Sequence, residues 1–347
     1  MKKYVYLFLV ILCVACNKQQ NTQLVFEKVP SINMQIGHLI TDADTISFVK
    51  YDTINEKKPL FVFLQGSLPR PLILQIDEER LWWMNRNNID TSVLNSCNVI
   101  EISHPYTPII ASMEYLDNQY AYSPTKEQGI YDVNYRLNNR LEVYVDRANK
   151  IINALAKEQW IESDSIFIYG YSQGFHVAAN VANINPLVRA VGLISSNPFG
   201  RIHTTIDKYR VEVIKGKMTE EDFQKQIQEI YDYWEYLATT PDSIFIKEKN
   251  IGDTPSNKFD FSQSSVDILC NLKQPLFIAY GTRDIGRTAC DLLPFYFIMA
   301  GKKNYKMRPA LGRGHSFEVI RDDGSHDYND MYPEKISAEF LEYVRSN

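Results

Sequence analysis

Apolar residues in this chain cluster in short continuous runs that alternate with longer stretches of helical period. Short runs of β-branched and aromatic residues are typical of strands buried on both faces, and apolar recurrence at three- and four-residue steps is typical of helices. This alternation predicts an α/β fold with a mostly parallel central sheet and helices on both of its faces. The strand-like runs are 60–64, 98–103, 166–169, 187–194, 275–280 and 304–308, and the helical patterns are 137–155, about 173–182, 287–300 and 333–345.

The segments around the first buried run follow weaker patterns. Residues 33–39 and 44–51 alternate moderately between apolar and polar positions, with turn-forming residues between them. They predict an N-terminal antiparallel hairpin. Residues 77–84 are expected to form a short helix in which Trp82 and Trp83 are half buried.

Residues 201–262 interrupt the alternation of strands and helices. Thr219 and the three acidic residues after it are typical of a helix start, and apolar residues at helical spacing follow as far as Leu237. We expect an inserted helical cap here, although a plain surface decoration fits the same pattern. The core then comprises residues 33–200 and 263–347.

The first residues of the chain have the layout of an export signal. A basic start precedes an apolar stretch that ends at Ala15, and this stretch is short for a transmembrane helix. The segment 1–15 resembles a bacterial lipoprotein signal peptide, which implies a lipidated Cys16 at the start of a tether, 16–32. We expect an exported protein of the cell envelope, anchored to the membrane by this lipid and facing the periplasm or the cell surface. A signal peptide without lipidation or an uncleaved anchor is the alternative.

Composition excludes several classes of protein. With 45% hydrophobic and 23% charged residues the chain is an ordinary globular protein, and a net charge of −5 argues against nucleic acid as a partner. Cys97, Cys270 and Cys290 are scattered and odd in number, so they do not form a disulfide framework. The chain has no C-x-x-C pair beyond its first residues and no His/Cys cluster. We therefore expect no metal and no cofactor. The sequence leaves the oligomeric state open.

A serine stands where the hydrophobic period changes. The segment Gly170-Tyr171-Ser172-Gln173-Gly174 lies between a strand-like run and a helical pattern. Glycines two residues before and after the serine permit a tight strand-to-helix turn in which the backbones cross closely. The pattern predicts a G-x-S-x-G nucleophile elbow, whereas an ordinary glycine-flanked turn is the alternative.

Serine needs a base and a group that orients the base before it acts as a nucleophile. Asp284 follows a buried strand, and His315 stands in a glycine-rich loop after the next strand. If the strands are parallel, both side chains project from the sheet edge at which Ser172 lies. His326, in a polar turn, and His176, in the helix after the serine, are weaker candidates for the base.

In these stretches the sequence resembles the α/β-hydrolase family, whose triad has the chain order Ser, acid, His. The resemblance covers about residues 33–347 and includes the loop that begins Gln65-Gly66, where many members have His before the glycine. It implies the α/β-hydrolase fold, with Ser172 as nucleophile, His315 as general base and then acid, and Asp284 as the residue that orients the histidine.

The resemblance also implies an oxyanion hole. We expect its donors to be the backbone amide of Gln173 and an amide near Ser67 or Leu68.

Three further side chains flank the expected cleft. Arg70, Tyr171 and Arg283 are possible substrate-binding residues, and a solvated or paired arginine is the alternative for the two cations.

The leading functional hypothesis is a serine hydrolase that cleaves a small-molecule carboxylic ester through an acyl-enzyme on Ser172. A peptidase or thioesterase uses the same triad, and the sequence does not separate these activities. A non-catalytic binding module with this fold is the hypothesis from another class.

Overall fold

The computed structural model describes residues 22–29, 31–244 and 253–347. The predicted signal peptide, Cys16 and the first part of the predicted tether lie outside the described residues, as does the segment 245–252 of the predicted cap.

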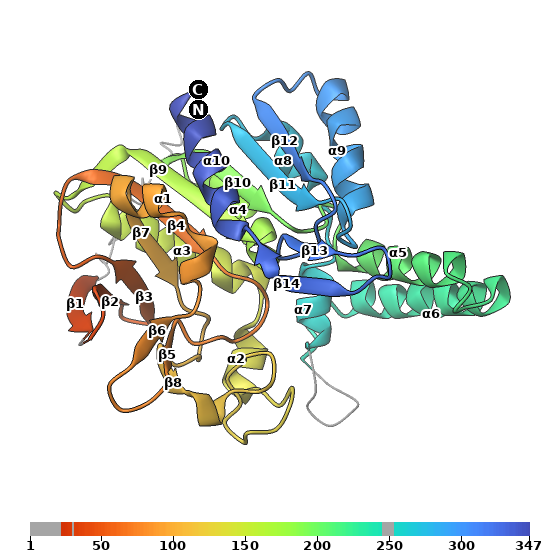
Figure 1. Ribbon diagram of the computed structural model, residues 1–347, viewed down its shortest axis with the longest axis horizontal. Helices are drawn as coiled ribbons and strands as arrows, with labels where there is room; N and C mark the ends of the chain where they lie inside the picture. Colours follow the sequence, from red (N-terminus) through yellow and green to blue (C-terminus); the bar gives the residue numbers. More distant parts are fainter. Residues whose placement is uncertain (1–21, 30, 245–252) are drawn as a thin grey trace, which may run out of the picture.

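A sheet of nine strands forms the centre of the molecule (Figure 1). Their order in the sheet is β1-β2-β3-β7-β4-β9-β10-β11-β12. The pairs from β1 to β7 are antiparallel, and the pairs from β7 to β12 are parallel. The strands are β1 (Gln23–Val29), β2 (Met34–Ile40), β3 (Thr45–Tyr51), β4 (Lys58–Leu64), β7 (Asn98–Ile102), β9 (Ile161–Tyr171), β10 (Val188–Ile194), β11 (Leu276–Gly281) and β12 (Tyr305–Ala310).

Helices cover both faces of this sheet, as the sequence predicts. In β4, Leu60 and Val62 pack in one core with α3, α4, α8 and α9, whereas Phe61 and Phe63 pack in the other core with α1 and α10. Neighbouring residues of a strand point to opposite faces, so a fully apolar run indicates a strand covered on both sides. The helices of the two layers are α1 (Thr91–Ser96), α3 (Leu141–Leu155), α4 (Gln173–Ile184), α8 (Val266–Asn271), α9 (Arg287–Met299) and α10 (Pro333–Arg345).

The N-terminal part of the sheet is larger than the sequence predicts. The predicted hairpin is present as β2 and β3, but β1 occupies residues 23–29 of the stretch expected to be a tether. β1 is an edge strand, and most of its side chains are exposed or half-buried. An edge strand needs no strongly apolar face, so its sequence resembles a polar linker.

Two more segments differ from the expectation. The predicted helix 77–84 is wrong, because β6 (Leu81–Trp83) pairs there with β5 (Ile73–Gln75), which also pairs with β8 (Ile110–Ser112). Only Trp83 of the two tryptophans is buried, and its Nε1 donates to Glu101 Oε2 at 2.6 Å. The segment after His315 forms an unpredicted hairpin of β13 (Glu318–Ile320) and β14 (His326–Met331).

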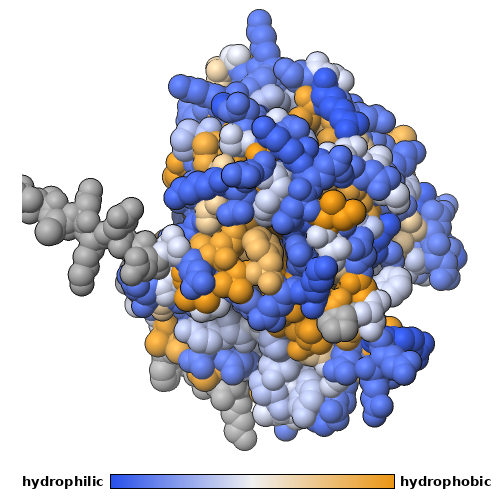
Figure 2. Space-filling model, turned by 90° about the vertical axis from the view of Figure 1, so that its left-hand side faces the viewer, coloured by the Kyte–Doolittle hydropathy of each residue, from blue (hydrophilic) through white to orange (hydrophobic). Residues whose placement is uncertain are grey.

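The face of the molecule shown in Figure 2 is mainly hydrophilic. On the side shown in Figure 2, apolar side chains form separate patches within a hydrophilic surface. In the part of the chain that the structure describes, no helix has the length and apolarity needed to cross a membrane.

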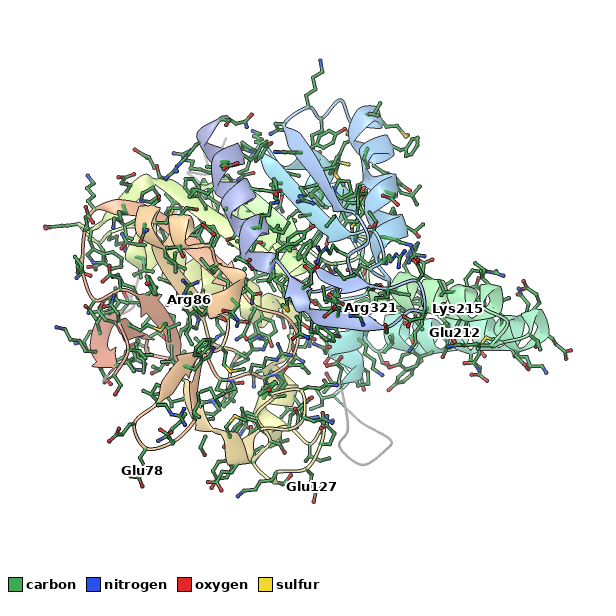
Figure 3. The ribbon with its side chains drawn as sticks, in the orientation of Figure 1. Glu78, Arg86, Glu127, Glu212, Lys215 and Arg321 are labelled. Atoms are coloured by element: carbon green, nitrogen blue, oxygen red, sulfur yellow. The ribbon has the colours of Figure 1, made fainter. Side chains whose placement is uncertain are left out.

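The predicted cap region forms a two-helix arm that projects from the body (Figure 1). The arm consists of α5 (Arg201–Ile214) and α6 (Glu220–Thr239), and α7 (Pro255–Asp260) leads back to the core. No side chain of α5 is fully buried, and α6 buries only Phe223, Ile227 and Leu237. Arg321 of the β13–β14 turn lies beside Lys215 at the end of α5, and both line one groove (Figure 3).

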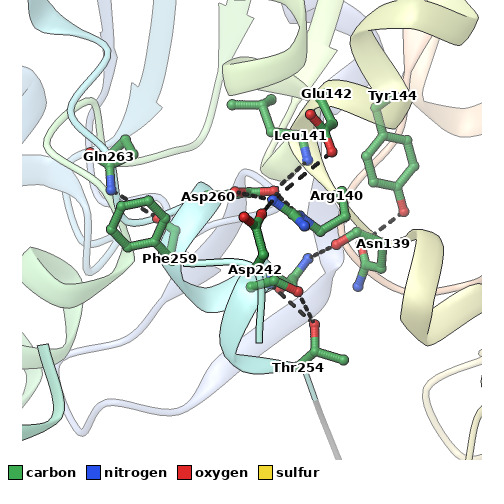
Figure 4. A network of polar contacts seen from close by, with 12 residues as sticks. Asn139, Arg140, Leu141, Glu142, Tyr144, Asp242, Thr254, Phe259, Asp260 and Gln263 are labelled. Atoms are coloured by element: carbon green, nitrogen blue, oxygen red, sulfur yellow. Dashed lines mark hydrogen bonds and ion pairs between the residues drawn. The ribbon is translucent and has the colours of Figure 1, made fainter. Parts of the chain in front are cut away.

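Ion pairs join α7 and the segment that follows α6 to the start of α3 (Figure 4). Arg140 Nε donates to Asp260 Oδ2 at 2.7 Å, and its Nη2 donates to Asp242 Oδ1 at 3.2 Å. The backbone N–H of Leu141 also donates to Asp260. Asp260 therefore binds the Arg140 guanidinium and accepts a hydrogen bond from the Leu141 backbone N–H. These contacts lie at the junction between α2 (Val133–Asn138) and α3.

We expect Phe297→Ala to lower the free energy of unfolding by about 3–5 kcal/mol, because it removes a fully buried ring from the core between α9 and the sheet. Phe295→Ala in the same helix is the matched control, since this ring is 65% exposed, and its effect should stay within about 0.5 kcal/mol. Urea unfolding of both variants measures the difference. Equal losses for the two variants would contradict the packing described here.

Candidate active site

The turn between β9 and α4 holds Ser172 in a strained backbone conformation, with φ 55° and ψ −115°. Two glycines make this turn possible. A Cβ on Gly170 would lie 2.1 Å from the carbonyl oxygen of Gly174, and a Cβ on Gly174 would lie 2.2 Å from that of Leu64. Only residues without a Cβ allow the strand, the helix and the end of β4 to approach this closely.

The structure brings Ser172, His315 and Asp284 into one hydrogen-bonded chain. His315 Nε2 lies 3.1 Å from Ser172 Oγ, and His315 Nδ1 lies 3.0 Å from Asp284 Oδ2. The three residues follow the carboxyl ends of β9, β11 and β12, which are parallel neighbours of the sheet through β10. If Nδ1 donates to the carboxylate, Nε2 is left as an acceptor for the serine hydroxyl.

Electrostatic interactions between His315 and Asp284 oppose the effect of their burial. Burial alone would lower the pKa of His315, but the charge of Asp284 and the hydrogen bond to it raise that pKa above its ordinary value. Burial alone would raise the pKa of Asp284, but the charge and hydrogen bond of His315 and nearby backbone amides hold that pKa below its ordinary value. The pair therefore favours an ionised aspartate and stabilises a positive charge on the imidazole.

The loop that holds His315 is fixed from both sides. The Tyr171 hydroxyl donates to the carbonyl oxygen of His315 at 3.2 Å and lies 3.0 Å from Ser316 Oγ. Buried Glu318 accepts from the Ser316 backbone N–H at 2.8 Å, and its other oxygen lies 2.7 Å from His326 Nδ1. Tyr171, predicted as a possible substrate-binding residue, thus supports the histidine loop.

The two predicted oxyanion segments lie next to the serine. Gln173 begins α4, so its backbone N–H has no acceptor within the helix and points from the positive end of the helix dipole. Gly66 is close enough that a Cβ there would lie 3.4 Å from Ser172 Cβ, and Ser67 and Leu68 line the space around the serine.

A buried polar network supports the loop at Gly66. The Tyr135 hydroxyl donates to the carbonyl oxygen of Ser67 at 2.7 Å. Buried His104 hydrogen-bonds to the Gly66 backbone and lies 3.0 Å from the Tyr144 hydroxyl through Nδ1. Burial lowers the pKa of His104 to about 3, so this ring is neutral.

The side chain of Gln173 links the elbow to the cap. Its Nε2 donates to Asn139 Oδ1 at 3.3 Å, and its Oε1 accepts from the Arg201 guanidinium. Arg201 also donates to Asp253 at 2.8 Å and to Asn257 at 2.7 Å. Sequence reasoning missed Arg201 and Asn139, because neither lies in a recognisable motif and only the fold brings them to the elbow.

Two cavities open at Ser172, and each has a volume of about 400 Å³. The first lies beside the start of α5 and is lined by Arg201, Thr204 and Asp253 together with Ser172, His315 and Asp284. The second lies on the other side of the serine, between the Gln65–Arg70 loop and the segment 84–88. A group bonded to Ser172 Oγ therefore has space on two sides.

The two predicted substrate-binding arginines and the two weaker histidine candidates lie in different parts of the structure. Arg70 lines the second cavity. Arg283 instead donates to Asp322 Oδ1 at 2.8 Å and to the carbonyl oxygen of Ile320, so it is a paired residue on the far side of His315. His176 is buried, with Nδ1 2.9 Å from Ser265 Oγ, and His326 begins β14 instead of lying in a free turn.

Within the described residues, no group of three or more His, Cys, Asp or Glu side chains has an arrangement that would hold a metal ion. The three cysteines outside the first residues are free thiols.

No family model and no curated protein matches the sequence. The structure is similar to dipeptidyl peptidase 4 from Porphyromonas gingivalis, with a TM-score of 0.50 and 11% identity over 94% of this chain and 36% of that chain. Acetyl xylan esterase 1 from Thermoanaerobacterium sp. gives a TM-score of 0.48 and 12% identity over 94% of this chain and 88% of that one. An acylaminoacyl peptidase from Pyrococcus horikoshii gives a TM-score of 0.47 and 14% identity over 95% of this chain and 41% of that one. The likeness is one of fold, and it confirms the predicted α/β-hydrolase fold.

We expect Asp284→Asn to lower the pKa of His315 below that of the wild type, because the substitution removes the charge that opposes the effect of burial. Titration of the imidazole by NMR measures this change. Glu318→Gln is the control and should lower the same pKa by less, since Glu318 makes the smallest of the contributions that raise it. An unchanged His315 pKa in Asp284→Asn would contradict the coupling of the two groups.

Proposed function

We propose that the protein is a serine hydrolase that cleaves carboxylic esters through an acyl-enzyme on Ser172. The observation that supports this most directly is the hydrogen-bonded chain from Ser172 Oγ through His315 to Asp284, at 3.1 and 3.0 Å. The strained elbow is the second support, because it presents the hydroxyl at the start of α4.

The first half of the reaction forms the acyl-enzyme. His315 Nε2 takes the hydroxyl proton while Ser172 Oγ bonds to the ester carbonyl carbon, and the carbonyl oxygen becomes an oxyanion. The amides of Gln173 and of the Ser67–Leu68 segment donate to that oxyanion, and one such donor contributes about 3–4 kcal/mol to transition-state stabilisation. The imidazolium then gives its proton to the leaving alkoxide, and the alcohol departs.

Water completes the cycle. His315 takes a proton from a water molecule whose oxygen attacks the acyl carbon, and the second tetrahedral intermediate expels Ser172 Oγ. The same proton returns to the serine, and the carboxylic acid leaves. Asp284 stabilises the positive charge that His315 acquires in both halves.

Two other functions use the same architecture. A peptidase or thioesterase has the same triad and differs in the groups that its pockets accept. A non-catalytic binding module is disfavoured, because Ser172 and His315 lie within hydrogen-bond distance and space is open on two sides of the serine.

We expect a fluorophosphonate to label the wild type on the peptide that contains Ser172, and Ser172→Ala to lose both the label and at least about 10⁴-fold of kcat on p-nitrophenyl esters. Mass spectrometry locates the adduct, and Ser196→Ala, a serine on the cavity wall without a hydrogen bond to His315, tests whether the label is specific. Esterase turnover that survives in Ser172→Ala would reject the proposal. Cleavage of aminoacyl amides well above that of esters would make the protein a peptidase.

We also propose that the protein is exported and bound to the cell envelope through a lipid on Cys16. After expression in a bacterial host that processes lipoproteins, the wild type and the control Cys13→Ser should incorporate labelled palmitate, and Cys16→Ser should not. A wild type that incorporates no palmitate would reject the lipid anchor.

A further inference from the structure

Among the residues that the structure describes, the second cavity at Ser172 is lined by several hydrogen-bond donors and by no acidic side chain. Its lining includes Arg70, the backbone of Gly66 and Ser67, and the amide side chains of the segment 85–88, and no aspartate or glutamate is among the lining residues. The first cavity differs, because Asp253 and Asp284 are both part of its wall. The two cavities therefore differ in charge: carboxylates paired with cationic or imidazole groups line the first, and the described lining of the second holds Arg70 without a carboxylate.

Arg70 is the cation of this wall, and it lacks a carboxylate partner among the residues that the structure describes. Its side chain donates through Nε to the carbonyl oxygen of Gln119 at 3.1 Å, and both Nη groups are left for a ligand. Asp117 is the acidic residue that affects Arg70 electrostatically. That carboxylate accepts from the backbone N–H groups of Gln119 and Ala121, at 2.8 and 3.0 Å, and forms no ion pair with Arg70.

Three other arginines near His315 or Ser172 are already paired with carboxylates. Arg283 pairs with Asp322 at 2.8 Å, and Arg321 pairs with Asp327 at 2.5 Å. Arg201, on the cap side of Ser172, pairs with Asp253 at 2.8 Å. Arg70 thus differs from these three in having its charge unmatched beside the nucleophile.

The wall opposite Arg70 is held in place by buried contacts. Asn85 Nδ2 donates to buried Glu101 at 2.5 Å, and Asn85 Oδ1 accepts from Asn88 Nδ2 at 2.9 Å. Glu101 lies behind this wall and outside the cavity lining, and burial raises its pKa to about 7. Asn85 is therefore held in position in the cavity wall, and the Glu101 carboxyl group does not line the cavity.

We propose that this cavity binds a carboxylate on the substrate, with Arg70 as its charge partner, so that the preferred substrates are esters that also bear a free carboxylate. A guanidinium forms two parallel hydrogen bonds with a carboxylate and binds it more strongly than it binds a neutral carbonyl group. A half-buried guanidinium without an anion has lost part of its hydration, and a bound carboxylate compensates for that loss. The inference rests on the proposed ester hydrolase activity, because it concerns the substrate of the same site.

The test compares esters that differ only in charge. One series is the monoethyl esters of succinic, glutaric and adipic acid against the corresponding primary carboxamides, which places the carboxylate on the acyl side. A second series is acetate esters of ω-hydroxy acids against their carboxamides, which places it on the alcohol side. In at least one series we expect kcat/KM to favour the carboxylate by about tenfold or more, equivalent to about 1.4 kcal/mol.

Substitution of Arg70 should remove this preference. Arg70→Gln should lower kcat/KM on the preferred anionic ester about tenfold or more relative to its carboxamide, and Arg70→Lys should retain part of the preference because it keeps the charge without the bidentate geometry. Arg189→Gln is the matched control, since it removes the same charge at the amino end of β10, where Arg189 is half exposed and pairs with Asp164. This control should keep the wild-type ratio. Circular dichroism and the thermal midpoint verify that each variant folds.

Binding separates failure of this inference from failure of the proposed activity. In the Ser172→Ala background, calorimetry should show tighter binding of the anionic esters than of their carboxamides, and Arg70→Gln should abolish the difference. If the wild type hydrolyses no ester but this binding difference is present, the carboxylate site stands and the proposed hydrolase activity fails. If the wild type shows no preference for the carboxylate in either series, or if Arg70→Gln leaves the preference intact, the inference is overturned.

Discussion

The arrangement of the whole site depends on the close approach of three backbone segments at one point. The end of β4, the end of β9 and the start of α4 meet where Gly170 and Gly174 have no side chain, and a Cβ at either position would lie within about 2.2 Å of a carbonyl oxygen. This contact forces Ser172 into a conformation that is rare for residues other than glycine. The strain is held by the sheet on one side and by the buried face of α4 on the other. As a result, the same turn places the Ser172 hydroxyl and the Gln173 backbone N–H, the first amide of α4, close together.

The other groups of the site are placed on loops, and buried polar contacts hold these loops. Glu318 and Tyr171 fix the histidine loop, and the His104–Tyr144 pair supports the loop at Gly66. Gln173 joins these supports to the cap, because its side chain contacts both Asn139 and Arg201. The start of α5 is therefore connected to the elbow by hydrogen bonds.

The secondary structure can be predicted from the sequence where apolar runs are continuous. The buried strands β4, β7, β9, β10 and β11 and the helix α10 have patterns that leave little choice of structure, and the order of Ser172, Asp284 and His315 along parallel strands places the three at one sheet edge. β1 and the β13–β14 hairpin are not recognisable, because exposed strands need no apolar alternation. Arg201, Asn139 and Glu318 are not recognisable either, since long-range packing alone makes them neighbours of the site.

The distribution of the site along the chain has a consequence for biosynthesis. His315 contacts Ser172 across 143 positions of sequence, and β11 and β12 must add to the sheet in parallel before the two side chains meet. Parallel pairing of distant segments is slow compared with local helix formation. An N-terminal fragment that already contains the serine elbow lacks the base, so an incomplete chain has an unactivated hydroxyl. In the proposed mechanism, Ser172 therefore becomes a competent nucleophile only after the chain as far as His315 has been made and folded.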